Sequence, residues 1–569
     1  MDLEKDTPTT RTPVSADANQ RTRDIARSTL IVMIAFGVAK VISLAQTVII
    51  AAEVGAGSEW DTFVTANRIP ELIFTLIAGG ALAHAFIPIF GGYLARDDRD
   101  GAWAIASHVI NTIFTATFIA SIIAFLFAPT IVADIVAPGF DASERTQSVE
   151  IMRILLLTTL IFSVSGIVMG ILQSHNHFLL PAIAPIMFDL GILFGVIFLL
   201  GPFGVHGIAI GAVIGSALHL GVQIPGLIRY RARWKAELGW RNPVLWRVIR
   251  LMLPRVAGLG VFSFNFIVMN NIASRLGTGS VAALDWGWRL MQIPQTLIGT
   301  AMGVVIFPTL AALSEVNDDD GKRDAMAGAL RFILVTSIPS AIGLIFIGRP
   351  VISLLERGAF DATASALVYS TLQFFALGLI VHSALEIIAR SFYADKDTLT
   401  PLWAALGGAG INLVLALTLT GVERVELLTI SNFGVEQFGF VPVERGQVGM
   451  LALANSLGVM FEVGFLLVVL RRRWDGIRED VLATTVAKTT VASLGMAVAI
   501  VLTNTALSLI GLTDGGLITT VLQVIIETGV GGVTFLVIAW LLRMEELTLL
   551  INMIRRRQPL DVQEAIITG

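Results

Sequence analysis

The sequence predicts an all-α polytopic membrane protein. Of its 569 residues, 55% are hydrophobic and only 14% are charged, and the mean hydropathy is +0.79. A soluble protein of this length carries about a quarter charged residues. The chain has no cysteine, which excludes disulfides and thiolate metal sites. Its net charge of −4 gives no reason to expect nucleic acid as a partner.

Apolar stretches of about 20 residues, the length needed to cross a bilayer, predict fourteen transmembrane helices. They lie near residues 28–52, 62–90, 104–129, 151–173, 179–201, 205–228, 248–275, 281–312, 325–348, 364–389, 399–421, 447–470, 482–508 and 516–542. The second and the eighth are interrupted by proline and by charged residues. The polar residues 1–27 predict a disordered cytoplasmic tail rather than a signal peptide, because no apolar core with a cleavage site follows them.

Lys and Arg are concentrated in alternate loops, which is the positive-inside pattern. The richest predicted inner loop carries Arg229, Arg231, Arg233, Lys235, Arg241, Arg247 and Arg250. Residues 471–478 contain four more arginines, and the predicted outer loops contain only scattered ones. The pattern places both termini, including the tail 543–569, in the cytoplasm. The predicted location is the bacterial inner membrane.

Four stretches recur in order at a spacing near 220 residues, which indicates an internal repeat. Examples are "VGAGS" (54–58) with "LGTGS" (276–280) and Pro181 with Pro401. The unit contains six crossings, and an even number makes the two copies parallel, as in some secondary transporters. The predicted parts are a six-helix lobe at 28–235, a second at 246–475 and an additional helix pair at 482–542.

The predicted outer loop 422–446 mixes polar and apolar residues. It is interpreted as a tolerated surface insertion, with a small hairpin or lid as the alternative.

Charged residues lie inside the first two crossings of each half, where hydrocarbon makes them costly. The candidate substrate-binding residues are Lys40, Asp61, Arg68, Arg255, Asp285 and Arg289. One interpretation is a water-filled cleft between the lobes with a basic lining. The alternative is that these side chains reach the headgroups from the helix ends. Bends at Pro70, Gly79, Gly80 and Pro294 are predicted hinges for the lining helices.

A cluster dominated by Arg and Lys favours an anion, and phosphate above all, because a guanidinium pairs with two oxygens at once. No nucleotide-binding motif, metal-ligand pattern or enzyme active site is present in the sequence, so an ion gradient or the membrane potential is the expected driving force. Asn265, Asn270, Asn271 and Asn412 could contribute to a Na⁺ site, and H⁺ is the other candidate coupling ion; no cofactor is expected.

Several motifs give the chain a resemblance to a known family. They are "GAGSEWDTF" leading into "RIPELI", "GGALAHAFIPIF", "APGF" (137–140), "LDWGWRLMQIPQTLIGTAMGVVIFPTL", "ERGAF" (356–360) and "FYADKDTLTP" (392–401). The chain resembles the MurJ (MviN) family of lipid II flippases, within the larger group that includes the MATE exporters and oligosaccharide flippases.

The resemblance implies fourteen helices and a cleft that takes the pyrophosphate and sugar-peptide head of lipid II, with the last two helices forming a groove for the lipid tail. Asp61, Arg68 and Arg289 stand at matching family positions, with Asp285 close to Arg289, and Lys40 stands at an arginine position. Two family cleft arginines are absent, because Gln46 and Phe74 occupy the corresponding places. Arg255 is a hypothetical partial replacement.

The sequence therefore predicts a monomeric flippase for lipid II, not an enzyme, whose partners are a polyprenyl-pyrophosphate lipid and membrane lipids. One alternative is a transporter of another lipid-linked oligosaccharide, or of amphipathic cations, for which the basic lining is unsuited. A second alternative is a scaffold that binds lipid-linked intermediates without transporting them.

Overall fold

The computed structural model describes residues 42–77, 81–421, 448–512, 516–544 and 546, and these residues form helices and connecting turns without a strand. Several predictions fall outside the described residues: the tail 1–27, nearly all of 543–569, the loop 422–446, and Lys40, Gly79 and Gly80. The side chain of Arg255 is outside the description as well.

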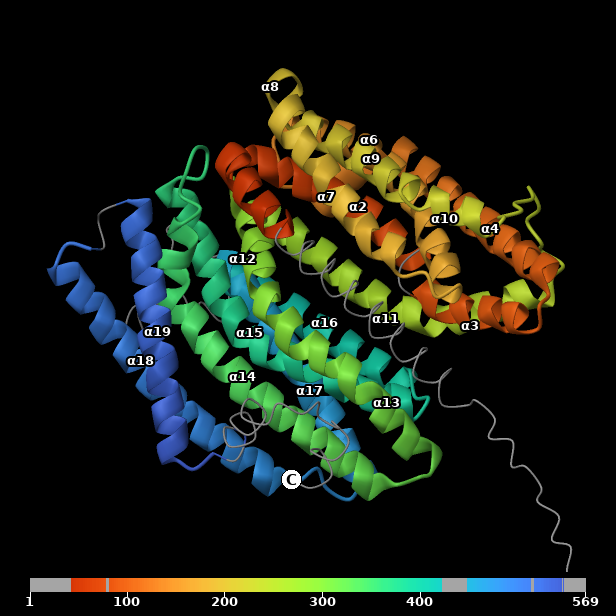
Figure 1. Cartoon of the computed structure of the whole chain (residues 1–569). Coiled ribbons are helices and arrows are strands. Elements are labelled where there is room, and N and C mark those ends of the chain that lie inside the picture. Colours follow the sequence, from red (N-terminus) through yellow and green to blue (C-terminus); the bar gives the residue numbers. More distant parts are fainter. Residues whose placement is uncertain (1–41, 78–80, 422–447, 513–515, 545, 547–569) are drawn as a thin grey trace, which may run out of the picture.

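The helices form two bundles with a helix pair at one edge (Figure 1). The first lobe consists of α2 (Ser58–Ile77), α3 (Ala81–Ala95), α4 (Arg99–Leu126), α5 (Ala128–Thr130), η1 (Ile131–Val136), α6 (Ala142–Ser174), α7 (Leu179–Phe194), η2 (Gly195–Leu199), α8 (Leu200–Phe203), α9 (Val205–Gly221) and α10 (Ile224–Arg229). The second lobe consists of α12 (Ser280–Gln295), η3 (Thr296–Thr300), α13 (Ala301–Glu315), α14 (Asp319–Ser353), α15 (Ala362–Ala394), α16 (Leu399–Thr420) and α17 (Val448–Arg473). The pair α18 (Glu479–Leu509) and α19 (Leu517–Leu541) packs against α14.

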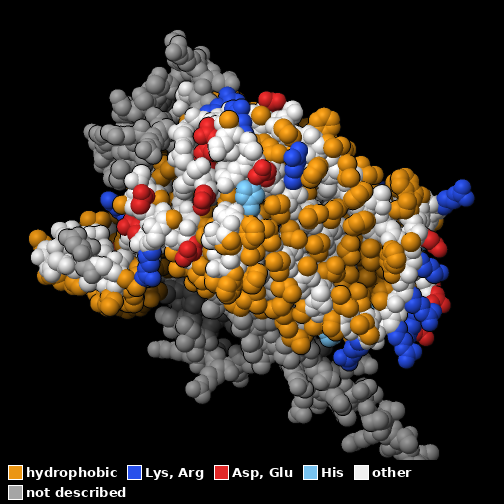
Figure 2. Space-filling model, turned by 90° about the horizontal axis from the view of Figure 1, so that it is seen from above, with side chains coloured by type: hydrophobic (Ala, Val, Ile, Leu, Met, Phe, Trp, Pro, Cys, Tyr) orange, Lys and Arg blue, Asp and Glu red, His pale blue; other side chains and the backbone are white. Residues whose placement is uncertain are grey.

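Twelve helices of the described chain are long and apolar enough to cross a membrane. They coincide with predicted crossings three to fourteen. The first crossing is described only from residue 42, and the second consists of α2 and α3 instead of the single segment 62–90. The count of fourteen therefore stays a prediction. On the face seen in Figure 2, hydrophobic side chains cover a broad central area and charged ones gather towards its edges, as a protein solvated by lipid requires.

Helix α11 (Pro243–Ser274) connects the two bundles and lies between them (Figure 1). Near its start, Leu245, Val248 and Met252 belong to the hydrophobic core that Phe86 and Trp103 of the first lobe help to form. Further along, α11 packs against α16 of the second lobe. One helix thus contacts both lobes along different parts of its length.

Backbone features recur at an offset of 220 residues, in agreement with the sequence repeat. Asp98 caps α4 by accepting from Gly101 N, and Asp318 caps α14 by accepting from Gly321 N. Asp141 and Asp361 cap α6 and α15 in the same way. Asn176 and Lys396 have φ angles of 57° and 61° at matching turns. The two lobes are therefore built with the same helix-capping chemistry.

The lobes are in close contact at the end of the molecule where α2 and α12 begin, here called the Asp61 end. A Cβ on Gly139, the glycine of "APGF", would lie 2.3 Å from Ser274 O. A Cβ on Gly358, the glycine of "ERGAF", would lie 2.1 Å from Ala52 O. Ala359 N also donates to Ala52 O at 2.8 Å. These motif glycines permit main-chain contact where any side chain would separate the segments.

Helices α7 and α9 of the first lobe meet along a seam of glycines. A Cβ on Gly191 of α7 would lie 2.2 Å from Gly215 Cα of α9, and one on Gly211 of α9 would lie 2.6 Å from the Cα of Gly195, the first residue of η2. Small residues four apart allow this approach, which in lipid is stabilised by van der Waals packing rather than by the hydrophobic effect.

We expect Gly211→Ala to lower the stability of the protein by about 1–3 kcal/mol, because the added methyl forces the two helices apart. The measurement is the apparent Tm of the purified protein in detergent. Gly201→Ala is the matched control, since nothing lies within 4 Å of its Cβ position. Equal Tm values for the two variants would show that the seam does not limit stability.

Candidate functional site

Asp61, a predicted site residue, joins the two lobes at the start of α12. Its side chain is fully buried. One carboxylate oxygen accepts from Gly279 N at 2.5 Å and the other from Ala282 N at 2.6 Å. Both donors belong to the first turn of α12 or to its N-cap, where main-chain N–H groups have no helical partner and the helix dipole favours negative charge. The first lobe therefore supplies the N-terminal cap of a helix in the second.

Two tryptophans pack beside this cap. Trp60 and Trp286 are both buried and stack with ring centroids 5.4 Å apart. Trp286 Nε1 donates to Gly55 O at 3.2 Å, across the lobe boundary. Trp60 Nε1 donates to Asp285 Oδ2 at 3.3 Å, also across the boundary. Sequence reasoning missed both rings as site residues, although each lies directly beside an aspartate in the sequence.

The Asp285 carboxylate interacts with two of the predicted site cations, Arg289 and Arg68. Arg289 Nε donates to its Oδ2 at 2.6 Å from the next turn of α12. Arg68 of the first lobe places Nη2 3.8 Å from its Oδ1. Asp285 and Arg68 have side chains only 9% and 10% exposed, whereas the Arg289 side chain is 48% exposed. The most accessible member of this group is thus a guanidinium.

Arg68 is held by three further contacts. Its Nε donates to Asn270 Oδ1 of α11 at 3.3 Å, and its Nη1 lies 3.8 Å from Glu71 Oε2. Its guanidinium also lies over the ring of Phe266, 5.4 Å from the centroid. The side chain therefore connects α2 with both α11 and α12. The burial of Asp61, Arg68 and Asp285 between the lobes is at odds with the alternative that they reach headgroups.

The asparagines considered for Na⁺ are used in packing. Asn270 donates to Thr65 Oγ1 and to Val136 O, and Asn271 donates to Ile135 O. Asn412 donates to Asn265 Oδ1 at 2.6 Å, which links α16 to α11. These bonds hold α11 to η1 on one side and to α16 on the other.

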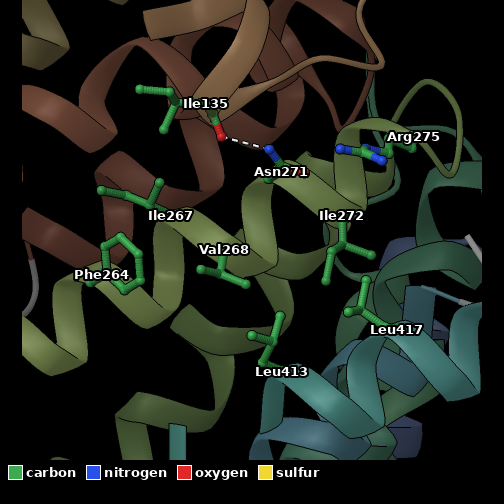
Figure 3. Close-up of a pocket in the computed structure, with 9 residues that line it drawn as sticks. All are labelled: Ile135, Phe264, Ile267, Val268, Asn271, Ile272, Arg275, Leu413 and Leu417. Atoms are coloured by element: carbon green, nitrogen blue, oxygen red, sulfur yellow. Dashed lines mark hydrogen bonds between the residues drawn. The ribbon is translucent and has the colours of Figure 1, made fainter. Parts of the chain in front are cut away.

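A cavity of about 250 Å³ lies between the lobes beside these asparagines (Figure 3). Ile135 of η1 borders it on one side and Leu413 and Leu417 of α16 on the other, while α11 supplies the rest of the lining. Most of its lining is apolar, with Asn271 and Arg275 as the polar members. This chemistry fits hydrocarbon better than a pyrophosphate, so the cavity does not extend the charged cluster.

The positions where the family has additional arginines are filled differently here. Gln46 is 8% exposed. Phe74 packs on Phe162 with ring centroids 5.7 Å apart. The sequence-predicted cluster thus consists, among described side chains, of Arg68, Arg289 and Asp285 with the adjacent Asp61. Arg255 lies on α11, and its contribution stays a prediction.

Two of the predicted hinges lie in the described chain. Pro70 lies inside α2, which continues through it to Ile77. Pro294 lies one residue before the end of α12, where the π-helical turn η3 leads into α13. A π-helical turn marks a local irregularity of the helix, which is where bending is easiest. The hinge role of all four residues stays a prediction.

Residues 50–513 match the family model described as "Lipid II flippase MurJ". The lipid II flippase MurJ of Burkholderia cenocepacia is 29% identical over 448 residues, which cover 77% of this chain and 82% of that protein. The probable lipid II flippase MurJ of Rhizobium tropici is 27% identical over 498 residues, covering 84% and 93% respectively.

Solved structures show the same fold. A structure titled "Lipid II flippase MurJ, inward closed conformation" superposes with a TM-score of 0.70 at 22% identity, covering 90% of this chain and 98% of that one. An inward-facing MATE multidrug transporter superposes with a TM-score of 0.63 at 15% identity, covering 78% and 96%. Because the family model matches most of the chain, the protein belongs to the MurJ family of lipid II flippases.

Proposed function

We propose that this protein is a flippase that moves lipid II, the undecaprenyl-pyrophosphate-linked peptidoglycan precursor, from the inner to the outer leaflet. Membership of the MurJ family supports the proposal most strongly. The curated relatives are named lipid II flippases or probable ones, and the chain covers most of their length. It acts as a transporter and carries out no chemical conversion of its substrate.

The guanidinium groups of Arg68 and Arg289, which both contact Asp285, form the proposed binding site for the pyrophosphate. Arg68 and Arg289 come from different lobes, so an anion bound to both would interact with both halves of the transporter. Asp285 partly neutralises the two cations. Pyrophosphate offers more oxygens than one carboxylate and can take over these charge-assisted hydrogen bonds. The partly exposed Arg289 makes the first contact.

The close contact at the Asp61 end supports alternating access. We assign this end to the outer face, following the positive-inside pattern, so that the described state is closed to the outside and both termini lie in the cytoplasm. Transport requires separation of the lobes here, which breaks the cap that Asp61 provides to α12. The barrier to opening therefore includes exposing a buried carboxylate and the first turn of a helix.

Both lobes and the charged pair lie within one chain, so we propose that a monomer suffices. The absence of nucleotide motifs from the sequence favours an ion gradient or the membrane potential as the driving force. Glu71 and Asp285 are the carboxylates beside the proposed phosphate site.

A second candidate substrate, another lipid-linked oligosaccharide, is favoured by Gln46 and Phe74 at two family arginine positions. Native mass spectrometry with lipid II, undecaprenyl phosphate and phospholipid in competition separates the two. Preferential retention of lipid II is expected. Equal, weak retention of all three lipids would favour the other oligosaccharide or a scaffold.

We expect Arg289→Gln to reduce lipid II retention and flipping about 10- to 100-fold, because one charge-assisted hydrogen bond is worth about 1.5–3 kcal/mol. Flipping is measured in proteoliposomes, and retention by native mass spectrometry. Arg153→Gln is the matched control, since this arginine contacts Phe125 away from the lobe boundary. Wild-type flipping by the Arg289 variant would contradict the assignment.

We expect Asp61→Asn to favour opening at the Asp61 end, because a neutral amide presents one acceptor where the carboxylate presents two. The loss is about 1–3 kcal/mol of the closed state. The chain has no native cysteine, so thiol labelling of Ala282→Cys, a buried position in α12, reports opening directly.

Labelling of Ala106→Cys, buried in the first-lobe core, serves as the control and is expected to be unaffected. If Asp61→Asn leaves the labelling rate at Ala282→Cys unchanged, the cap does not restrain opening.

A further inference from the structure

Residues 231–242, here called the strap, connect α10 to α11 and run along α4 with little regular structure. Polar side chains of α4 bind the strap through its main chain. Asn111 Nδ2 donates to Lys235 O at 2.6 Å and to Glu237 O at 2.9 Å, and Thr112 Oγ1 donates to Leu238 O at 2.9 Å. These main-chain bonds hold the strap against α4, and Trp234 Nε1 adds a side-chain bond by donating to Asn111 Oδ1 at 2.9 Å.

The strap also positions the start of α11. Asn242 caps this helix by accepting from Val244 N at 2.9 Å, and its Nδ2 lies 3.2 Å from His108 Nδ1 of α4. Trp246 Nε1 donates to Trp240 O at 2.8 Å. A ligand bound to the strap would therefore lie at the start of α11, the helix that contacts both lobes.

Most basic side chains of this region have no carboxylate partner in the part of the chain that the structure describes. Residues 229–250 contain seven Lys and Arg but one acidic residue, Glu237. Arg233 pairs with Asp100 at 2.9 Å. Within the described chain no carboxylate lies within ion-pair distance of the other six, which are Arg229, Arg231, Lys235, Arg241, Arg247 and Arg250. Lys and Arg side chains gather along the right-hand edge of Figure 2, the side on which α4 begins in Figure 1.

The same end of the second lobe is different, because its cations are largely matched by acids. Six of them form ion pairs: Lys322, Arg323, Lys396, Arg471, Arg473 and Arg478. At this end of the molecule, acidic residues neutralise most of the positive charge of the second lobe. The positive charge of residues 229–250 in the first lobe is largely uncompensated. Uncompensated charge of this density is typical of a surface that meets an anionic partner.

Exposed tryptophans place the strap at the depth of the lipid headgroups. Trp234 and Trp240 are 61% and 60% exposed, although a soluble surface rarely leaves such rings open to water. The residues of α4 that hold the strap, from Ser107 to Thr112, lie in the first half of a helix long enough to cross the membrane. Tryptophans at that depth form the aromatic belt of membrane proteins.

A polar cavity of about 310 Å³ lies between the strap and α4. Asp100, Trp103 and Ala104 line it from α4, and Arg233 and Lys235 line it from the strap. Lys235 uses both its main-chain N–H and C=O in bonds to α4, so its ammonium is the free group that the strap offers there. A phosphate with an adjoining glycerol fits a cavity of this volume, whose lining has two cations and one carboxylate.

We propose that the strap is a binding site for anionic phospholipid headgroups, with phosphate held by Lys235 and Arg233 and the acyl chains lying against Trp234 and Trp240. The occupant is a lipid of the surrounding leaflet and not the transported substrate. Basic segments at a membrane surface attract anionic lipid with a free energy that adds up over the cations. The site fixes the base of α11 to the first lobe and to the plane of the membrane.

Native mass spectrometry of the full chain with equal amounts of phosphatidylglycerol and phosphatidylethanolamine tests the site. Wild type is expected to retain phosphatidylglycerol preferentially. The double variant Lys235→Gln, Arg241→Gln removes two unpaired charges and leaves the main-chain bonds to α4 in place. Its retention of phosphatidylglycerol is expected to fall about fivefold for each charge removed.

The matched control is Arg471→Gln, Arg478→Gln, which removes two cations that are paired with Glu479 and Asp324. It is expected to retain the lipid within about twofold of wild type, on the basis that paired cations contribute little. An equal drop in both double variants, or no drop in the strap variant, overturns the proposal. Apparent Tm values of both variants establish that they are folded.

A further arm adds undecaprenyl pyrophosphate to the wild-type protein. Bound phosphatidylglycerol is expected to stay, since the proposed substrate site lies elsewhere. Its displacement would assign the strap to the substrate and overturn the proposal. Arg289→Gln is expected to retain phosphatidylglycerol fully, so a failure of the proposed flippase function and a failure of the strap site give different results.

Discussion

A single buried carboxylate, that of Asp61, determines how the two halves of this protein meet. A carboxyl group buried away from water is tolerated only when its oxygens are compensated by hydrogen bonds. The first turn of α12 supplies that compensation through Gly279 N and Ala282 N. The main chains must approach closely for these bonds to form, and glycines at 139, 279 and 358 make that approach possible. The paired tryptophans then exclude solvent around the contact.

The same constraint explains why the charged cluster is built as it is. Asp285 lies between Arg68 and Arg289, so neither lobe carries an isolated charge in the closed state. Asn270 extends this arrangement to α11, and Asn412 with Asn265 ties α11 to the second lobe. In this cluster, polar groups of α2, α11, α12 and α16 are each bonded to a group on another of these helices. When the lobes move, these polar groups must therefore exchange their present hydrogen-bond partners for others.

The two lobes share their helix caps but differ in how charge is compensated at the strap end. Asp98 and Asp318 perform the same local task in each, because a helix N-terminus needs an acceptor wherever it lies. The second lobe pairs six cations at this end, whereas along the described strap Arg233 is paired with Asp100 and Lys235 and Arg241 have no carboxylate partner. Duplication thus preserved the fold, while the surface chemistry of the two halves diverged.

The sequence by itself determined the membrane class, twelve of the described crossings, the repeat and the cations at Arg68 and Arg289, because hydropathy, loop charge and costly buried charges are local properties. Only the tertiary structure decided that Asp61 caps α12, that Trp60 and Asp285 are bonded and that α11 belongs to both lobes. These contacts join residues more than 200 positions apart, as between Asp61 and Gly279, and no local pattern specifies which donor an acceptor will meet. Packing of the lobes makes that choice.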